Sequence, residues 1–278
     1  MRTMANSELG TRNSELTVGF IGYGTAARQV HKGICQGLAG NCRLAAVLVR
    51  RADAVAPDGA LCTTERARFV AEPLDLVVEL AGQQAVREHA EAVLLAGRDL
   101  LVLSIGALAD EVLHERLCQA ARATGSRLLL PSGAIGGLDA IASAAIGGLD
   151  EVTLTTRKPP DALQTGTDQD RLLGAAITEP LLLYEGPARE AVRQFPANVN
   201  VAAALSLAGV GFDRTQVRIY ADPAVTRNTH EVRARGWFGE LTFTIQNVPT
   251  SNPKTGRITA LSVLKAIRDL QAPARLVG

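Results

Sequence analysis

From Leu16 onward, short apolar runs of β-forming residues alternate with amphipathic segments, and this alternation constrains the fold more than any other feature of the sequence. The amphipathic segments carry Ala, Leu and Val at helical spacing, with Arg and Glu on the opposite face. Strands that alternate with helices predict a doubly wound parallel sheet of the Rossmann type. The predicted strands span 16–21, 43–49, 75–80, 99–104 and 126–130, and the predicted helices span 25–38, 64–70, 84–96 and 109–123.

The pattern changes after Pro131, where glycine-rich loops, a helix near 137–147 and longer alternating stretches follow. A hairpin turn is predicted at Gly236-Trp237-Phe238-Gly239. This half is therefore predicted to be an α+β domain with a mostly antiparallel sheet. The alternating stretches are 150–157, 215–221, 229–236 and 240–248, and a final helix is predicted over 255–270. The expected division is a loose tail (1–15), a first domain (16–131) on which the C-terminal segment (252–278) packs back, and a second domain (132–251).

Composition limits the classes of function that this chain can have. Its 278 residues are 47% hydrophobic, enough for a well-buried core, and its 29 basic and 28 acidic residues show no electrostatic footprint for nucleic acid or an anionic membrane. The longest apolar run is much shorter than the ~20 residues that span a bilayer. The four cysteines have neither CxxC spacing nor a neighbouring histidine in ligand register, so we expect no metal site and a cytoplasmic protein with reduced thiols.

The first predicted strand ends in a glycine-rich turn with the pattern G-x-G-x-x-A at Gly22, Gly24 and Ala27. Gly22 permits a tight turn, and Gly24 lets a pyrophosphate approach the backbone at the start of a helix. The coincidence of strand, turn and helix predicts a dinucleotide site that includes Thr25 and Ala26. A glycine-rich turn without a ligand is the alternative.

The second predicted strand leads into Arg50-Arg51, where an NAD-selective enzyme usually carries an acidic residue. A guanidinium at Arg50 can hold the 2′-phosphate of NADP, although a solvated basic pair is equally consistent with the pattern. We therefore expect both NAD and NADP to serve as cofactors.

Two further turns follow predicted strands, at Glu79-Leu80-Ala81-Gly82 and Ser104-Ile105-Gly106-Ala107. Doubly wound sheets bind ligands at the carboxyl ends of their strands. The small residues Ala81 and Gly82 would let a nicotinamide ring lie close to the backbone, although simple tight turns fit equally well.

Among the four histidines, His230 stands apart because it opens a predicted strand of the second half, after Arg227-Asn228-Thr229. An acid/base role near neutral pH is possible there, but the pattern alone favours a buried structural histidine.

Several segments together resemble the L-aspartate dehydrogenase family, from about residue 16 to residue 271. The motifs of the second half are more specific than the glycine-rich turn. They are Pro131-Ser132-Gly133-Ala134-Ile135-Gly136-Gly137, Thr156-Arg157-Lys158-Pro159-Pro160, Phe195-Pro196-Ala197-Asn198-Val199-Asn200-Val201-Ala202-Ala203, Asn228-Thr229-His230 and Asn252-Pro253-Lys254-Thr255. The polar stretch 163–171 has no counterpart in the family pattern.

The resemblance implies that His230 is the active-site histidine and that Ala134 and Asn200 contact the nicotinamide cofactor. It also implies a homodimer that oxidises L-aspartate to iminoaspartate or oxaloacetate for NAD biosynthesis, with catalysis and dimerisation in the second domain. Amine oxidation requires a base for the amine proton, a role that suits His230. The two substrate carboxylates need donors, for which Lys158, Asn198 and Thr229 are candidates, although surface or capping roles fit Lys158 and Thr229 at least as well.

Three alternatives remain open at this point. Two are other two-domain Rossmann reductases, similar to homoserine dehydrogenase or to dihydrodipicolinate reductase, whose catalytic lysine or His-rich segment is not evident in this sequence. The third is a sensor that binds NAD(P) without catalysis, which leaves an acid/base histidine in the second domain unexplained.

Overall fold

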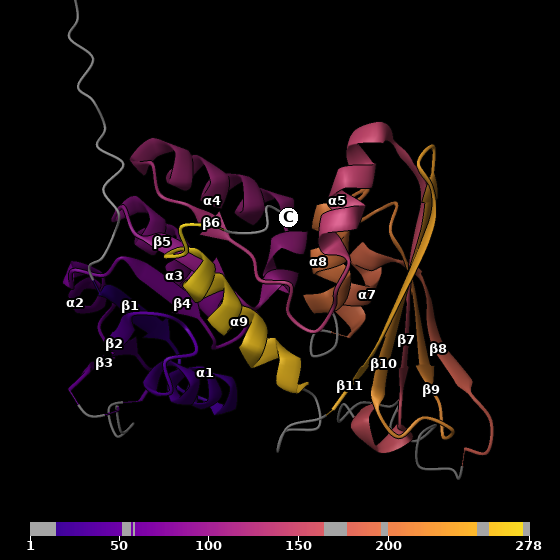
Figure 1. The fold of residues 1–278 in the computed structure, drawn as a ribbon, viewed down its shortest axis with the longest axis horizontal. Coiled ribbons are helices and arrows are strands. Elements are labelled where there is room, and N and C mark those ends of the chain that lie inside the picture. The colour runs from indigo at the N-terminus through magenta and orange to yellow at the C-terminus, as the bar shows by residue number, and fades with distance from the viewer. Residues whose placement is uncertain are drawn as a thin grey trace, which may run out of the picture.

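The structure is a computed structural model that describes residues 15–51, 57, 59–163, 177–195, 200–248 and 256–274. Its first domain is built on a six-stranded parallel sheet with the strand order β3-β2-β1-β4-β5-β6 (Figure 1). Neighbouring β1 and β4 lead to opposite sides of the sheet, which makes their carboxyl ends the switch point where such folds bind ligands. The strands are β1 (Leu16–Ile21), β2 (Cys42–Leu48), β3 (Leu61–Thr63), β4 (Leu76–Glu79), β5 (Asp99–Val102) and β6 (Leu128–Leu129).

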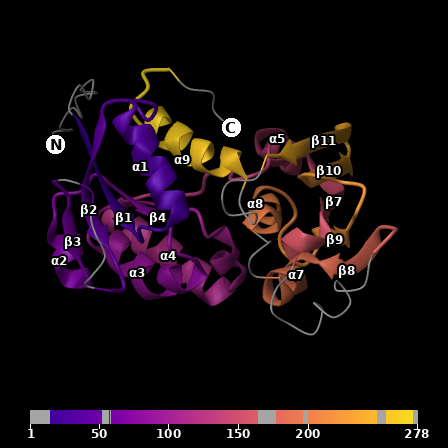
Figure 2. The ribbon, with the colours of Figure 1, turned by 90° about the horizontal axis from the view of Figure 1, so that it is seen from below.

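Helices cover both faces of this sheet (Figure 2). On one face α1 (Thr25–Cys35) packs against the C-terminal helix α9 (Arg257–Asp269) so closely that a Cβ at Gly33 would lie 2.3 Å from Leu264 Cδ1. The other face carries α3 (Gln83–Leu95) and α4 (Glu111–Thr124), and η1 (Ile105–Ala109) precedes α4. The short α2 (Arg66–Ala71) joins β3 to β4.

The second domain is a five-stranded sheet with the order β11-β10-β7-β9-β8. All neighbouring strands are antiparallel except β7 and β9, which are parallel. The helices of this domain lie on the face of the sheet that is turned toward the first domain, and they fill the space between the two sheets (Figures 1 and 2). The elements are α5 (Leu138–Gly147), β7 (Leu149–Lys158), η2 (Pro160–Leu163), β8 (Leu181–Pro187), α7 (Ala188–Gln194), α8 (Asn200–Ala208), β9 (Gln216–Ala221), β10 (Asn228–Gly236) and β11 (Gly239–Asn247).

The predicted fold class is confirmed, and the hairpin closes where the sequence predicted it, with Gly236 paired to Gly239. Several described elements lie outside the predicted set, namely β3, η1, η2, β8, α7 and α8. Most of the polar stretch 163–171 and of the predicted tail lies outside the described residues; Leu163 is buried.

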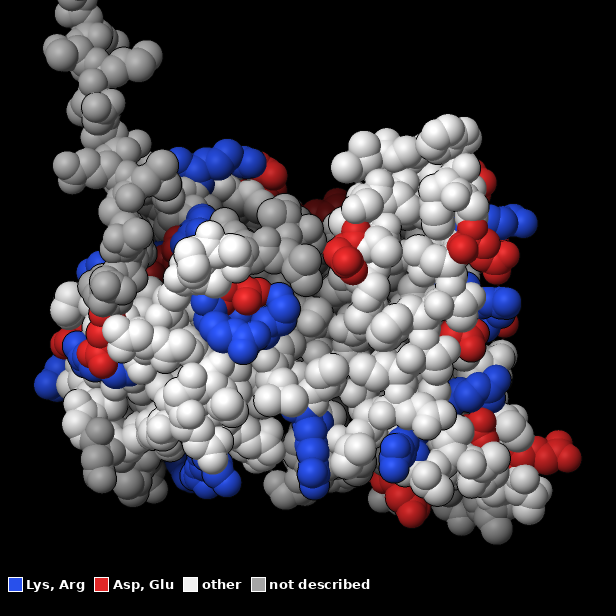
Figure 3. Space-filling view, viewed as in Figure 1, with Lys and Arg blue, Asp and Glu red and all other residues white. Residues whose placement is uncertain are grey.

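Basic and acidic side chains are interspersed over the face shown in Figure 3, without an area of one sign. No helix among the described residues is long and apolar enough to cross a membrane. The four cysteines are free thiols, and the described part of the chain holds no group of metal-ligating side chains.

Candidate active site

The glycine-rich turn between β1 and α1 has the conformation and the open space that a dinucleotide requires. Gly22 has a φ of +89°, and a Cβ there would lie 2.6 Å from the Cβ of Ala81. A Cβ added at Gly24, in contrast, would have no atom within 4 Å. No neighbouring group of the described protein therefore requires a glycine at this position. Gly24 precedes α1 without a side-chain cap, which leaves the first backbone N–H groups, at Thr25 and Ala26, for an anion. These residues fit the pyrophosphate of a dinucleotide.

Arg50 follows β2, the strand next to β1, and its side chain is exposed. It has no hydrogen bond or ion pair among the described residues. The end of β2 is the position at which doubly wound domains recognise the adenosine ribose.

A buried carboxylate organises the turns that follow β4 and β5. Glu79 is fully buried, and its Oε1 accepts hydrogen bonds from the backbone N–H groups of Ala81 and Gly82, both at 2.7 Å. Ser104 donates to it twice, from its backbone N–H at 2.9 Å and from its hydroxyl at 3.1 Å. Burial raises the pKa of Glu79, while the hydrogen bonds act in the opposite direction. The two turns predicted to lie under the nicotinamide are therefore joined through one side chain.

Asn200 connects the second domain to the same region. Its Oδ1 accepts a hydrogen bond from the backbone N–H of Gly106 at 3.0 Å, across 94 positions of the sequence. Asn200 begins α8, so this bond places the end of a second-domain helix against the turn after β5.

His230 and Lys158 lie together on the inner face of the second sheet. His230 is 2% exposed, and its Nδ1 lies 2.9 Å from the hydroxyl of Thr156 on the adjacent strand. Lys158 is also 2% exposed and lies two residues beyond Thr156 on the same face of β7. Burial, and secondarily the positive charge of Lys158, lowers the pKa of His230 to about 3. The free protein therefore holds a neutral imidazole beside a buried cation at physiological pH.

Two asparagines extend this polar cluster toward Ala134. Asn247 on β11 is buried, and its Nδ2 donates to the backbone carbonyl of Ala134 at 3.0 Å. Asn228 pairs with Asn247 in the strand register and shares the face of His230, two residues away. Its Oδ1 is buried without a hydrogen-bond partner among the described residues.

Thr229 is not brought together with these residues. It alternates with His230 along β10 and therefore points to the opposite face, where its cross-strand neighbour is Arg157. Its hydroxyl donates to the carbonyl of Arg227 at 3.2 Å. This is a local turn contact, and substrate binding by Thr229 stays a prediction. Asn198 lies outside the described residues.

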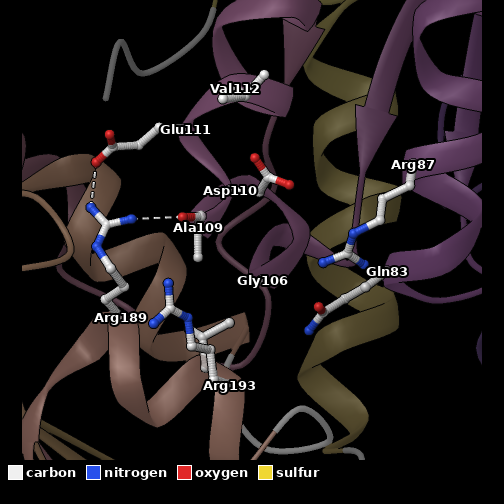
Figure 4. A pocket seen from close by; sticks show the side chains of 10 residues that line it. Gln83, Arg87, Gly106, Ala109, Asp110, Glu111, Val112, Arg189 and Arg193 are labelled. Atoms are coloured by element: carbon white, nitrogen blue, oxygen red, sulfur yellow. Dashed lines mark hydrogen bonds and ion pairs between the residues drawn. The ribbon is translucent and has the colours of Figure 1, made fainter.

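A separate pocket of about 560 Å³ lies between the domains on the α3/α4 side (Figure 4). Arg189 of α7 borders it and crosses to the first domain, where it donates to the carbonyl of Ala109 at 2.7 Å and pairs with Glu111; it also pairs with Asp213. Arg87 and Gln83 of α3 line the opposite wall. Gly106 lines this pocket. Because Gly106 lies in the turn after β5, the pocket borders one of the two turns that Glu79 joins.

Sequence reasoning did not assign roles to Thr156, Glu79 or Asn247. Thr156 had a usable signal, since strict alternation along a strand places it on the same face as Lys158. The signal for Glu79 was weaker, because it is only a single acidic residue at the end of an otherwise apolar strand, Leu76–Glu79. For Asn247 no local signal exists, because its partner Ala134 is 113 positions away.

A doubly wound domain with an open glycine turn, joined to a second sheet that holds a buried neutral histidine, defines the class of two-domain NAD(P)-dependent dehydrogenases. Comparison with known proteins narrows this class. Residues 139–270 match the family described as "Aspartate dehydrogenase, C-terminal", and residues 22–131 match the one described as "Homoserine dehydrogenase, NAD binding domain".

Relatives of this family match most of the chain. The L-aspartate dehydrogenase of Methanocella arvoryzae is 41% identical over 266 residues, which is 93% of this chain and 98% of that protein. The L-aspartate dehydrogenase of Methanosarcina barkeri is 46% identical over 207 residues, covering 73% of this chain and 76% of that protein. The crystal structure of aspartate dehydrogenase from Thermotoga maritima superposes with a TM-score of 0.77 at 30% identity, covering 95% of this chain and 100% of that one. The chain belongs to the L-aspartate dehydrogenase family.

A dihydrodipicolinate reductase from Paenisporosarcina shares the fold at 12% identity and a TM-score of 0.53. The first domain alone does not separate the enzyme alternatives, since its family pattern is that of homoserine dehydrogenase. The second domain, which carries His230, matches the aspartate dehydrogenase family, and this match distinguishes the chain from the two other reductases.

Proposed function

We propose that this protein oxidises L-aspartate to iminoaspartate with NAD or NADP, that the imine or the oxaloacetate and ammonia formed on its hydrolysis leave the site, and that this reaction feeds NAD biosynthesis. The observation that carries the proposal is the buried neutral His230 beside the buried Lys158 in a chain of this family. The dinucleotide, bound at Gly22, Gly24, Thr25 and Ala26, supplies the hydride acceptor.

Lys158 gives the site its selectivity for an acidic amino acid. Its ammonium group places a positive charge among buried residues, where the interaction with an anion is screened less than at the surface. A substrate carboxylate that enters this site gains from the charge already present. Asn228 Oδ1 offers a buried acceptor on the same sheet face, which suits an N–H of the substrate amine.

His230 is the base for the amine proton. When Nδ1–H donates to the hydroxyl of Thr156, the lone pair is on Nε2, which can accept a proton from the substrate directly or through water. The substrate brings negative charge that offsets the effect of Lys158, which raises the proton affinity of His230 when the base is needed. The same nitrogen can later activate the water that attacks the imine carbon.

Purified protein should reduce NAD or NADP when L-aspartate is added at alkaline pH, followed by NAD(P)H absorbance, and should do so much less with L-glutamate or L-homoserine. His230→Ala should lower turnover about 10²- to 10⁴-fold, the usual contribution of general-base catalysis, without weakening cofactor binding. Clear cofactor binding without reduction by any of these amino acids would favour the sensor alternative.

We further propose that the protein is a cytoplasmic homodimer, supported by the family resemblance and the free thiols. Light scattering of the purified protein should give twice the chain mass of 29.3 kDa.

A further inference from the structure

Glu79 is a buried acid that the proposed reaction does not use. It lies at the carboxyl end of β4, next to the switch point of the first sheet, and it is fully buried. No positively charged side chain among the described residues contributes to its electrostatic environment. A carboxylate that remains buried without a cationic partner calls for an explanation, because burial of an uncompensated charge is unfavourable.

The hydrogen bonds around Glu79 match its ionised form. Three backbone N–H groups, from Ala81, Gly82 and Ser104, point at its two oxygens, and these groups can only donate. A backbone donor at each oxygen suits a carboxylate, which only accepts hydrogen bonds. Burial raises the pKa of Glu79, so these three donors are what favours its ionised form, and they hold the negative charge in a fixed position between the turns after β4 and β5.

This position belongs to the nicotinamide half of the proposed cofactor site. In doubly wound domains the adenosine half lies beyond β1 toward β2, and the other half crosses the switch point toward β4 and β5. Gly106, two residues after Ser104, is hydrogen-bonded to Asn200. The oxidised nicotinamide ring carries a positive charge, and the reduced ring carries none.

We propose that Glu79 is a charged positioning residue that stabilises the oxidised cofactor relative to the reduced one. This inference rests on the proposed dinucleotide site. The carboxylate holds the two turns in place, and its charge attracts the cationic ring through a medium of low dielectric constant, which strengthens the interaction. Binding of the oxidised cofactor supplies the countercharge that the described residues do not provide. The reduced cofactor gains nothing from this charge, so the site discriminates between the two forms.

The test measures the dissociation constants of NAD⁺ and NADH without amino acid, NADH by its fluorescence and NAD⁺ by displacing it. Glu79→Gln removes the charge and keeps the size, and it should weaken NAD⁺ binding about tenfold more than NADH binding. Glu79→Asp keeps the charge but is too short for all the donors, so it should weaken both forms while the ratio of the two constants stays near that of the wild type. Glu115→Gln, an exposed acid on α4, controls for net charge and should change neither constant.

Equal weakening of both forms by Glu79→Gln, or no change, would overturn the proposal. If Glu79→Gln does not fold, Glu79→Asp decides alone, since a clear change in the ratio of the two constants in this variant, which keeps the charge, contradicts a role for charge. Failure of the wild-type protein to bind either form would instead contradict the proposed dinucleotide site.

Discussion

The hydroxyl of Thr156 lies 2.9 Å from Nδ1 of His230, and this contact fixes the orientation of the imidazole ring. The two residues are cross-strand partners in β7 and β10, so the backbone register sets their separation. A rigid ring with one nitrogen engaged has the other nitrogen available for the substrate.

Thr156→Val should lower kcat at least tenfold and leave cofactor binding unchanged, because it keeps the side-chain shape but removes the partner of Nδ1. An unpaired buried nitrogen should also cost about 1–3 kcal/mol of stability. Thr156→Ser should restore kcat, and Thr155→Val, on the opposite face of β7, should be close to wild type in steady-state kinetics. A wild-type kcat in Thr156→Val would show that ring orientation does not depend on this bond.

Stability should fall as the pH drops from about 6.5 toward 3, and His230 should be a major cause. In the unfolded chain the ring binds a proton near its ordinary pKa of 6.5, whereas in the folded protein the pKa is lowered to about 3. The unfolded state therefore binds more protons in this window, and the stability of the folded state decreases as the pH falls. The effect is at most about 5 kcal/mol. Urea unfolding of wild type and His230→Gln at about pH 7 and about pH 5 should show a smaller loss in the variant, and equal losses would contradict this assignment.

Gly24→Ala should fold normally but lose dinucleotide affinity at least tenfold. Its φ of −85° is ordinary for alanine and no atom lies near the added methyl group, so only a ligand would meet it. Gly22→Ala should instead lower stability by about 1–3 kcal/mol, because its φ is +89° and its Cβ would collide with Ala81. Thermal melts and cofactor titrations separate the two effects. Unchanged affinity in Gly24→Ala would argue against a pyrophosphate at this turn.

Arg50→Glu should weaken NADP binding at least tenfold and leave NAD binding nearly unchanged, because only NADP carries the 2′-phosphate that a guanidinium would hold. Arg122→Glu, an exposed residue of α4, controls for the change in net charge. Titration of both cofactors with each variant provides the comparison. If both cofactors bind Arg50→Glu as they bind the wild type, Arg50 is a solvated surface residue.

The fold could be predicted because each unit of the first domain is encoded locally. Alternation of strand and helix gave β1, β2, β4 and β5 near their true bounds, and the spacing of the glycines placed the turn before α1. In the second domain the hairpin was also local. The parallel pairing of β7 with β9 was not, since it joins strands separated by about sixty residues and depends on the helices packed between them.

The site was predictable only in part, because distant segments build it. His230 and Lys158 were found through motif resemblance, and the structure brings them together on one sheet face. Thr229 was a candidate because it lies in the motif Asn228-Thr229-His230, but neighbouring residues of a strand point to opposite faces, so the structure does not bring it together with His230. Glu79 was not selected, because its importance depends on Ser104, which is 25 positions away.

The return of α9 to the first domain means that the chain passes between the domains twice, once before α5 and once after β11. Gly33 and Leu264 interlock, and Ser262 accepts a hydrogen bond from the backbone N–H of Gly133, so this last helix touches both α1 and the first crossing. A fragment that ends before α9 would therefore expose the apolar side of α1 and lose the hydrogen bond between Ser262 and Gly133, so the last helix stabilises both the first domain and the segment that leads out of it.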